Sequence, residues 1–309
     1  MARFHVQRST HINASAEKVF ETVADFGTWS TWSPWLCCEP AAEVTVTESP
    51  NTVSSVYTWR GEIVGQGEIE HRRLDAPRHI EEELRFIKPF PSKSKVTFDI
   101  KPSGEGTEIT WDMHGSLPWF LFWMRSQMVA MIGMDYERGL KMLKEWIETG
   151  EVLSQTVVHG VEPVGPLRVA GVRNRCSLAD IGASMTAAFD AAVNALPKHG
   201  LPLDGEPISV YHQFDLAKQT CEYTSGFAVP ESASVPSELS TWSLPQGRAL
   251  HVEHGGRYEH LGNSWSAAQM HMRYKKLKPN KCGAFEIYRN DPCATPPAEL
   301  RTDIFLPLK

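Results

Sequence analysis

Hydrophobic and polar positions divide the first half of the chain into strand-like and helical stretches. Apolar side chains recur at every second position over 80–86, 96–100 and 109–113, which is the pattern of strands with one covered face. Spacings of three and four residues over 13–23 and 119–147 predict two helices. This half therefore predicts a short helix, a run of antiparallel strands and a long closing helix whose apolar stripe packs on the sheet.

The second half contains one pattern of strand, helix and two strands twice. Two such βαββ units in succession predict a pseudo-twofold domain with a ligand site in the groove between the units. Together with the first half, this gives an α+β protein. The expected strands are 167–175, 208–214, 221–227, 248–252, 285–288 and 302–306, and the expected helices are 177–196 and 263–272.

Strand alternation resumes at 150–155, directly after the first long helix, without a disordered linker. A chain of 309 residues is longer than one core usually supports, so we expect two domains, 1–150 and 156–309. Each half carries its own strands, helices and apolar faces.

The amino-acid composition limits the classes of binding partner that we expect. The chain has 31 Lys plus Arg against 37 Asp plus Glu, which supplies no basic surface for nucleic acid. The start shows no apolar signal-peptide core, and the aromatic run 118–124 is too short to span a bilayer, so we expect a cytoplasmic protein that does not bind membranes. The six cysteines lack CxxC spacing, and we expect reduced thiols, no metal and no cofactor.

One carboxylate stands inside an otherwise apolar strand. Glu286 lies within 284–288, two positions before Tyr288, which shares its side of the strand. Either Glu286 faces water, or it holds a cationic or polar ligand in a pocket, or it works as a general acid or base.

The order of several motifs in the first half is informative. Segments 12–20, 25–35, 57–61, 88–90 and 106–111 together resemble the polyketide cyclase/dehydrase group of the SRPBCC (START-like) superfamily, over roughly residues 1–150. The resemblance implies a helix-grip fold, in which a curved antiparallel sheet wraps a long C-terminal helix around a deep apolar cavity. It implies a hydrophobic small-molecule ligand and no particular reaction. Three tryptophans of the first half could either line the mouth of this cavity or simply pack in the core: Trp29, Trp32 and Trp35.

The second half resembles the GyrI-like, or AraC effector-binding, domain. The resemblance rests on 254–261, Trp265, 285–292 and 302–308, and it covers roughly 156–309. It implies that Tyr258 and Glu286 face a groove that binds bulky aromatic, often cationic compounds, while some relatives hydrolyse cyclopropane-containing compounds. Transcriptional relatives carry a helix-turn-helix module first, and the START-like half in that place disfavours a transcription factor.

These observations leave three hypotheses open. The first is sensing or sequestration of a hydrophobic, aromatic or cationic small molecule. The second is a hydrolase in which Glu286 is the general base and Tyr258 hydrogen-bonds the developing charge. The third is a gyrase-inhibitor-like protein-interaction module. The candidate ligand-binding residues of this half are Glu286, Tyr258, Tyr288, Tyr211 and Trp265.

Histidines give no metal motif in the sequence. His71, His79 and His114 lie on or beside strands without metal-like grouping, so we expect structural or surface roles. His251 and His254 do not form HExxH, and strand alternation places them on opposite faces.

Overall fold

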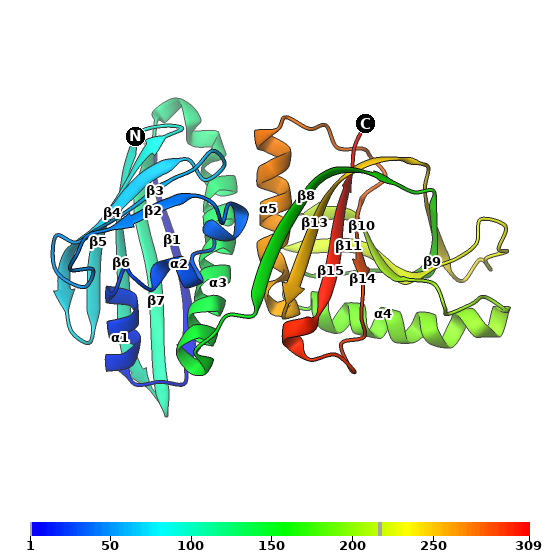
Figure 1. Ribbon diagram of the computed structural model, residues 1–309, viewed down its shortest axis with the longest axis horizontal. Helices are drawn as coiled ribbons and strands as arrows, with labels where there is room; N and C mark the ends of the chain where they lie inside the picture. Colours follow the sequence, from blue (N-terminus) through cyan, green and yellow to red (C-terminus); the bar gives the residue numbers. More distant parts are fainter. Residues whose placement is uncertain (1, 216–217) are drawn as a thin grey trace. The chain divides into compact units, whose positions relative to one another are not determined.

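The computed structural model describes residues 2–215 and 218–309 of the chain. It divides into two compact units, Met1–Val152 and Leu153–Lys309. Each unit has its own antiparallel sheet and its own helices (Figure 1). Within the described ranges, every helix lacks either the length or the apolar run that crossing a membrane requires.

The first unit is built on a seven-stranded sheet with the order β1-β7-β6-β5-β4-β3-β2. Apart from the β1–β7 pair, which joins the two ends of this region, neighbours in the sheet are neighbours in the chain. Its elements are β1 (Ala2–Ile12), α1 (Ala16–Ala24), α2 (Trp29–Trp32), η1 (Leu36–Cys38), β2 (Glu43–Val46), β3 (Val56–Arg60), β4 (Gln66–Asp75), β5 (His79–Lys88), β6 (Ser92–Ser103), β7 (Gly106–Leu117), η2 (Trp119–Met124) and α3 (Arg125–Thr149).

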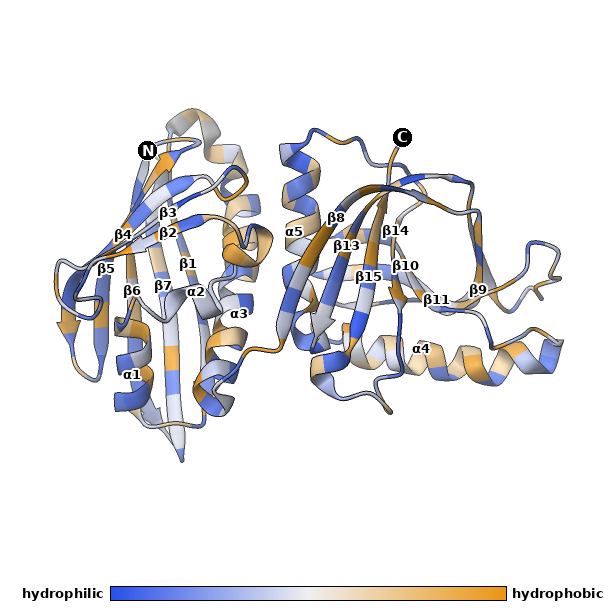
Figure 2. Cartoon of the chain, viewed as in Figure 1, coloured by the Kyte–Doolittle hydropathy of each residue, from blue (hydrophilic) through white to orange (hydrophobic). Residues whose placement is uncertain are grey.

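Strand alternation places one face of this sheet in the core. On β7, Ile109, Trp111 and Met113 are buried, whereas Glu108 and His114 are exposed. Figure 2 shows the same alternation as changing bands of colour along the strand. The helix-facing side of the sheet is therefore fixed by the sequence period of two.

The long helix α3 closes the core of the first unit. Tyr136 of α3 stacks on Trp111 of β7, with ring centroids 3.9 Å apart, and Leu140 and Leu143 are buried beside it. The helix ends where Gly150 takes a left-handed conformation with φ of 82°, which glycine adopts without steric cost. The predicted helix-grip fold is confirmed.

The second unit is built on an eight-stranded antiparallel sheet with the order β12-β9-β11-β10-β14-β15-β13-β8. The predicted βαββ units are β9-α4-β10-β11 and β13-α5-β14-β15, and they meet where β10 pairs with β14. The strands β8 and β12 lie outside the repeat, at the two edges of the sheet. The elements are β8 (Ser154–Val164), β9 (Leu167–Ser177), α4 (Ile181–Ala195), η3 (Leu196–His199), β10 (Pro207–Asp215), β11 (Thr220–Ala228), β12 (Ser240–Leu244), β13 (Gly247–Gly256), η4 (Tyr258–His260), α5 (Leu261–Tyr274), β14 (Ala284–Tyr288), η5 (Pro297–Glu299) and β15 (Arg301–Pro307).

Both long helices of the second unit cover the same face of its sheet. Helix α4 packs on β9 and β11, and α5 packs on β13 and β8. On the opposite face, Trp242 of the edge strand β12 contacts Phe285 of the central strand β14, with ring centroids 5.3 Å apart. Because three strands separate β12 from β14, this contact requires the sheet to curve strongly away from the helices.

Candidate functional site

Glu286 lies at the centre of the second sheet, on the face that the helices cover. Its strand β14 is flanked by β10 and β15, and Glu286 pairs with Ser209 on one side and Ile304 on the other. Alternation directs Glu286 to the helices and its neighbours Phe285 and Ile287 to the opposite face. The residue is fully buried, with 0% of its surface exposed.

Neutral donors alone hold the Glu286 carboxylate. The indole Nε1 of Trp265 donates to Oε1 at 2.5 Å, and the hydroxyl of Tyr288 donates to Oε2 at 2.6 Å. Among residues 2–215 and 218–309, no lysine, arginine or histidine forms an ion pair with this carboxylate. Its negative charge is therefore solvated by dipoles and is not balanced by a cation.

This environment changes the proton affinity of several groups. Burial raises the pKa of Glu286, although hydrogen bonds from Tyr288, Trp265 and Tyr211 work in the opposite direction. Burial and the nearby Glu286 charge raise the pKa of Tyr211 and Tyr288 well above the usual value. The tyrosines therefore stay neutral donors at ordinary pH, and Glu286 is the group that titrates.

Aromatic rings surround the carboxylate. Tyr211 meets the Trp265 ring edge-on at 5.2 Å, and Phe189 of α4 meets the Tyr288 ring edge-on at 5.6 Å. The thioether sulfur of Met185 lies 3.8 Å from the Tyr211 hydroxyl and 3.9 Å from the Tyr288 hydroxyl. Aromatic rings and a thioether therefore surround the buried carboxylate, and a ligand role for these residues stays a prediction.

Tyr258 joins the site from a turn before α5. Gly256 has a φ of 112°, and a Cβ there would lie 2.1 Å from the Leu153 carbonyl oxygen, so the turn requires glycine. The Tyr258 ring then meets Tyr288 edge-on at 5.8 Å. Its hydroxyl is buried beside that of Thr302, with which it makes at most a poorly aligned hydrogen bond, and burial raises the pKa of Tyr258. Among the described residues, the Tyr258 donor is therefore only weakly engaged.

The site is closed over its carboxylate. Trp265, Tyr258 and Tyr288 are each partly exposed, whereas Glu286 is not exposed at all. The surrounding rings therefore cover the Glu286 carboxylate, and the ligand groove stays a prediction. A ligand that reaches Glu286 has to displace at least one of these rings.

Phe214 belongs to the rim, although the sequence pattern did not identify it. Its ring stacks on Tyr211 at 5.1 Å and lies 6.2 Å from Trp265, and it is 45% exposed. A β-bulge between Tyr211 and Gln213 shifts the register of β10 and brings Phe214 to the side of Tyr211. Strict alternation places Phe214 on the opposite face from Tyr211, so the position of Phe214 could be predicted only by someone who knew of the bulge.

The three candidate tryptophans of the first unit pack in or beside its core. Trp29 is 7% exposed and Trp32 is 1% exposed, and the Trp32 ring meets Trp111 at 5.7 Å. Trp35 is partly buried and its indole donates to Asp135 of α3 at 3.1 Å. Packing therefore accounts for the aromatic residues of segment 25–35. A ligand role for Trp29, Trp32 and Trp35 stays a prediction.

The first unit has a buried carboxylate of its own, Glu82. It forms an ion pair with His71, Oε1 to Nδ1 at 3.1 Å, and both side chains are 0% exposed. The other imidazole nitrogen of His71 hydrogen-bonds the carbonyl of Ala24 at 2.8 Å, and Phe26 stacks on the ring at 3.8 Å. Sequence reasoning did not single out Glu82, although it occupies an inward position in the alternation of its strand.

A hollow of about 460 Å³ opens on the strands of the first unit. Titratable residues form most of its lining, including Arg3, Glu83 and Lys93, and none of the lining residues comes from α3. It is therefore not the apolar cavity between sheet and helix that the resemblance implied. That cavity stays a prediction.

Two of the histidines lie in groups whose ligand atoms are close enough to hold a metal ion. His114 lies beside His5 and Asp112, and His251 lies beside His159 and Glu162. The sequence spacing did not indicate these groups because each joins residues of two strands that are distant in the sequence. His254, in contrast, is fully buried on the other face from His251 and hydrogen-bonds Ser264 at 3.0 Å, as alternation predicted.

Comparisons with known families match both halves of the chain. Residues 3–148 match a family described as polyketide cyclase / dehydrase and lipid transport, and residues 161–309 match one described as a GyrI-like small molecule binding domain. A search of the curated proteins gives no significant match.

Solved structures with low sequence identity also align. Protein CV1439 from Chromobacterium violaceum is 15% identical, with 47% of this chain and 96% of that one covered and a TM-score of 0.37. The Aha1 dimer from Colwellia psychrerythraea is 13% identical, with 47% and 97% covered and a TM-score of 0.36. EcmrR, in a structure of an EcmrR–DNA complex, is 17% identical, with 60% and 68% covered and a TM-score of 0.44.

Proposed function

Because the chain is a fusion of a polyketide cyclase/dehydrase-type (SRPBCC) domain and a GyrI-like small-molecule-binding domain, we propose that it senses or sequesters a hydrophobic, flat aromatic cation. The cation binds in the second domain, against Glu286. The observation that carries this proposal is a fully buried carboxylate that has only neutral hydrogen-bond donors.

A buried carboxylate without a cation is costly, because burial removes its hydration and neutral donors restore only part of it. A cationic ligand would supply the missing charge. The raised pKa of Glu286 has the same cause, since burial without a cation favours the protonated form. Glu286 would therefore gain more from a bound cation than an ordinary core residue would.

The surrounding rings favour an aromatic ligand. Trp265, Tyr288 and Tyr258 present partly exposed faces and edges around the carboxylate. Such rings attract a flat cation through dispersion and through cation–π interaction. Met185 beside the two tyrosine hydroxyls has a flexible side chain that adapts to ligands of different shape.

The test uses the full chain and a matched pair of probes, N-methylquinolinium and its neutral carbon isostere 1-methylnaphthalene. The two have nearly the same size and shape, and the cation keeps its charge at every pH. We expect tighter binding of the cation in calorimetric titrations. Equal affinity for both probes, or no binding of either, would remove the basis for the proposal.

A second candidate function is hydrolysis of a strained or reactive hydrophobic compound. The observation that favours it is the buried hydroxyl of Tyr258, only weakly engaged by Thr302, near a carboxyl group of raised pKa. Glu286 would activate water as the general base, and Tyr258 would hydrogen-bond the developing charge.

Incubation with cyclopropane-bearing and ester-bearing aromatic compounds, followed by mass analysis of the products, distinguishes the two functions. Hydrolysis requires product formation that falls by about 10²-fold or more in Glu286→Gln, the usual contribution of a general base. Binding alone requires that every compound is recovered unchanged.

We place this binding in the cytoplasm. The free cysteines fit a reducing compartment, although the Sγ atoms of Cys176 and Cys221 are only 3.7 Å apart. Within the same proposal, the first domain binds a hydrophobic compound. Nucleic acid and membranes are not partners. The gyrase-inhibitor-like role is the weakest alternative function.

A further inference from the structure

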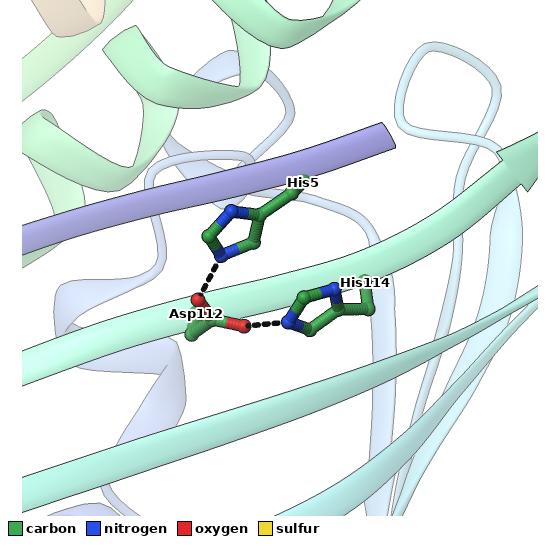
Figure 3. A group of neighbouring side chains, drawn as sticks. All are labelled: His5, Asp112 and His114. Carbon is green, nitrogen blue, oxygen red and sulfur yellow. Dashed lines mark hydrogen bonds and ion pairs between the residues drawn. The ribbon is translucent and has the colours of Figure 1, made fainter. Parts of the chain in front are cut away.

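Two histidines and an aspartate come together on the outer face of the first sheet. His5 of β1 stands directly opposite His114 of β7 in the strand register, and Asp112 precedes His114 by two residues on the same face. Figure 3 shows both imidazoles directed at the two oxygens of one carboxylate. The pairing of β1 with β7 therefore fixes the positions of the Cβ atoms of all three side chains.

The three groups are arranged around a common point. His114 Nε2 lies 3.1 Å from Asp112 Oδ1, and His5 Nε2 hydrogen-bonds Asp112 Oδ2. The two imidazole rings stack with centroids 4.3 Å apart and an interplanar angle of 9°. The three possible ligand atoms all lie within 4.8 Å of one another.

We propose that His5, Asp112 and His114 form a binding site for a divalent transition metal ion of the zinc class. Two imidazole nitrogens and one carboxylate oxygen are ligands that zinc accepts in tetrahedral sites, and the fourth position is left for water. The residues require only small side-chain rotations, because their ligand atoms are already close and the strands hold their Cβ atoms.

Proton positions do not block this site. Each Nε2 now donates to Asp112, so metal binding requires the ring proton to move to Nδ1. The side chains of His5 and His114 are 48% and 61% exposed, so this exchange can proceed through water. Lys95, opposite His114 on β6, is paired with Glu81 at 2.6 Å and is not an uncompensated charge beside the ion.

The second histidine group of the chain differs in one decisive respect. Both ring nitrogens of His251 already face carboxylates, Nδ1 to Glu162 at 2.8 Å and Nε2 to Asp303 at 3.2 Å. Burial opposes the charged form of His251, yet these two carboxylates raise its pKa. Because carboxylates already face both ring nitrogens, this group serves as the matched control.

Metal binding would also tie the edge strand β1 to β7. An ion that binds the folded state alone stabilises it by mass action, so zinc should raise the unfolding temperature of the first domain in a concentration-dependent way. Substitution of the exposed ligands removes this increment and leaves the buried core intact.

The test is calorimetric titration of zinc into metal-stripped full chain, with wild type, His5→Ala, His114→Ala, Asp112→Asn and His251→Ala. We expect a zinc ion per chain in wild type and in His251→Ala, and an affinity that is lower by roughly tenfold or more in each of the other three variants. Cobalt absorption provides a second readout, because imidazole and carboxylate ligands give no thiolate charge-transfer band.

Four outcomes would overturn the proposal. The first is the absence of zinc binding in wild type, and the second is unchanged affinity in His114→Ala. The third is a thiolate band with cobalt, which would assign the ion to cysteines. Loss of binding in His251→Ala, with binding kept in His5→Ala, would place the site in the second domain.

Discussion

Glu82 in the first domain and Glu286 in the second are both fully buried carboxylates, each on the inner face of its sheet. Glu82 has a basic partner within its own domain, His71, at 3.1 Å. Glu286 has the indole of Trp265 and the hydroxyl of Tyr288, which carry dipoles and no charge. Both residues are buried, but only Glu82 has a basic side chain beside its carboxylate.

That difference separates structural chemistry from binding chemistry. Glu82 already has a basic side chain 3.1 Å away, so it gains less from an incoming cation than a carboxylate without one. Glu286 lacks such a partner and can gain one from outside the chain. Under the proposed function, the absence of an internal cation, and not burial alone, distinguishes Glu286 as the binding carboxylate.

The largest expected effect concerns Glu82. Glu82→Ala leaves His71 buried beside an empty space, and we expect it to destabilise the first domain by about 3–5 kcal/mol. Scanning calorimetry measures the loss, and the affinity of the second domain for N-methylquinolinium serves as the control. Wild-type stability of this variant would mean that the pair contributes nothing to the fold, and the contrast with Glu286 would fail.

The next effect is the pH dependence of cation binding. Glu286 has a raised pKa in the empty domain and must be ionised to pair with a cation. Affinity for N-methylquinolinium should therefore be constant above that pKa and fall by about tenfold, or 1.4 kcal/mol, for each pH unit below it. Titrations in a pH series measure the slope. A profile that is flat from pH 8 to pH 4 would assign binding to some other group.

A smaller effect is expected on stability. The folded pKa of Glu286 lies above its unfolded value, so the protonated carboxyl's contribution is present at low pH and is lost as pH rises through the folded pKa. Glu286→Gln, whose amide oxygen can accept from Trp265 while its amide NH₂ donates to Tyr288, should stabilise the second domain by on the order of 1 kcal/mol at pH 8. The gain should shrink toward pH 5. Thermal unfolding at both pH values measures it, and a destabilised variant at pH 8 would contradict the account.

The smallest effect separates two tyrosines. The buried hydroxyl of Tyr258 makes at most a poorly aligned hydrogen bond with Thr302, so Tyr258→Phe should change stability by no more than about 0.5 kcal/mol. Tyr288→Phe removes the hydrogen bond to Glu286 and should cost about 1 kcal/mol. Denaturant titration of both variants provides the comparison. Equal losses would show that Tyr258 has a partner in solution.

Much of the fold follows from periodicity. Alternation over 109–113 and helical spacing over 119–147 predicted β7 and the closing helix α3, and the βαββ repeat predicted the centre of the second sheet. These predictions succeed because burial of one face requires a fixed period. The domain boundaries at 150 and 156 stay a prediction, which separate expression of 1–150 and 156–309 would test.

The site was predictable only in part. Glu286 stood out because a charge interrupts an apolar strand, and the resemblance connected it with Tyr258. The contact between Trp265 and Glu286 depends on where α5 crosses the sheet, which one sequence does not encode locally. The bulge that turns Phe214 inward breaks the period on which prediction relies.

The central claim is that Glu286 provides the negative charge that selects a cation. The most direct measurement compares N-methylquinolinium with 1-methylnaphthalene in wild type, Glu286→Gln and Glu82→Gln. We predict that wild type and Glu82→Gln share one preference for the cation, and that Glu286→Gln reduces this preference by about 2–5 kcal/mol, the usual effect of removing one partner of a buried charge pair. A cation preference that is unchanged in Glu286→Gln would contradict the claim.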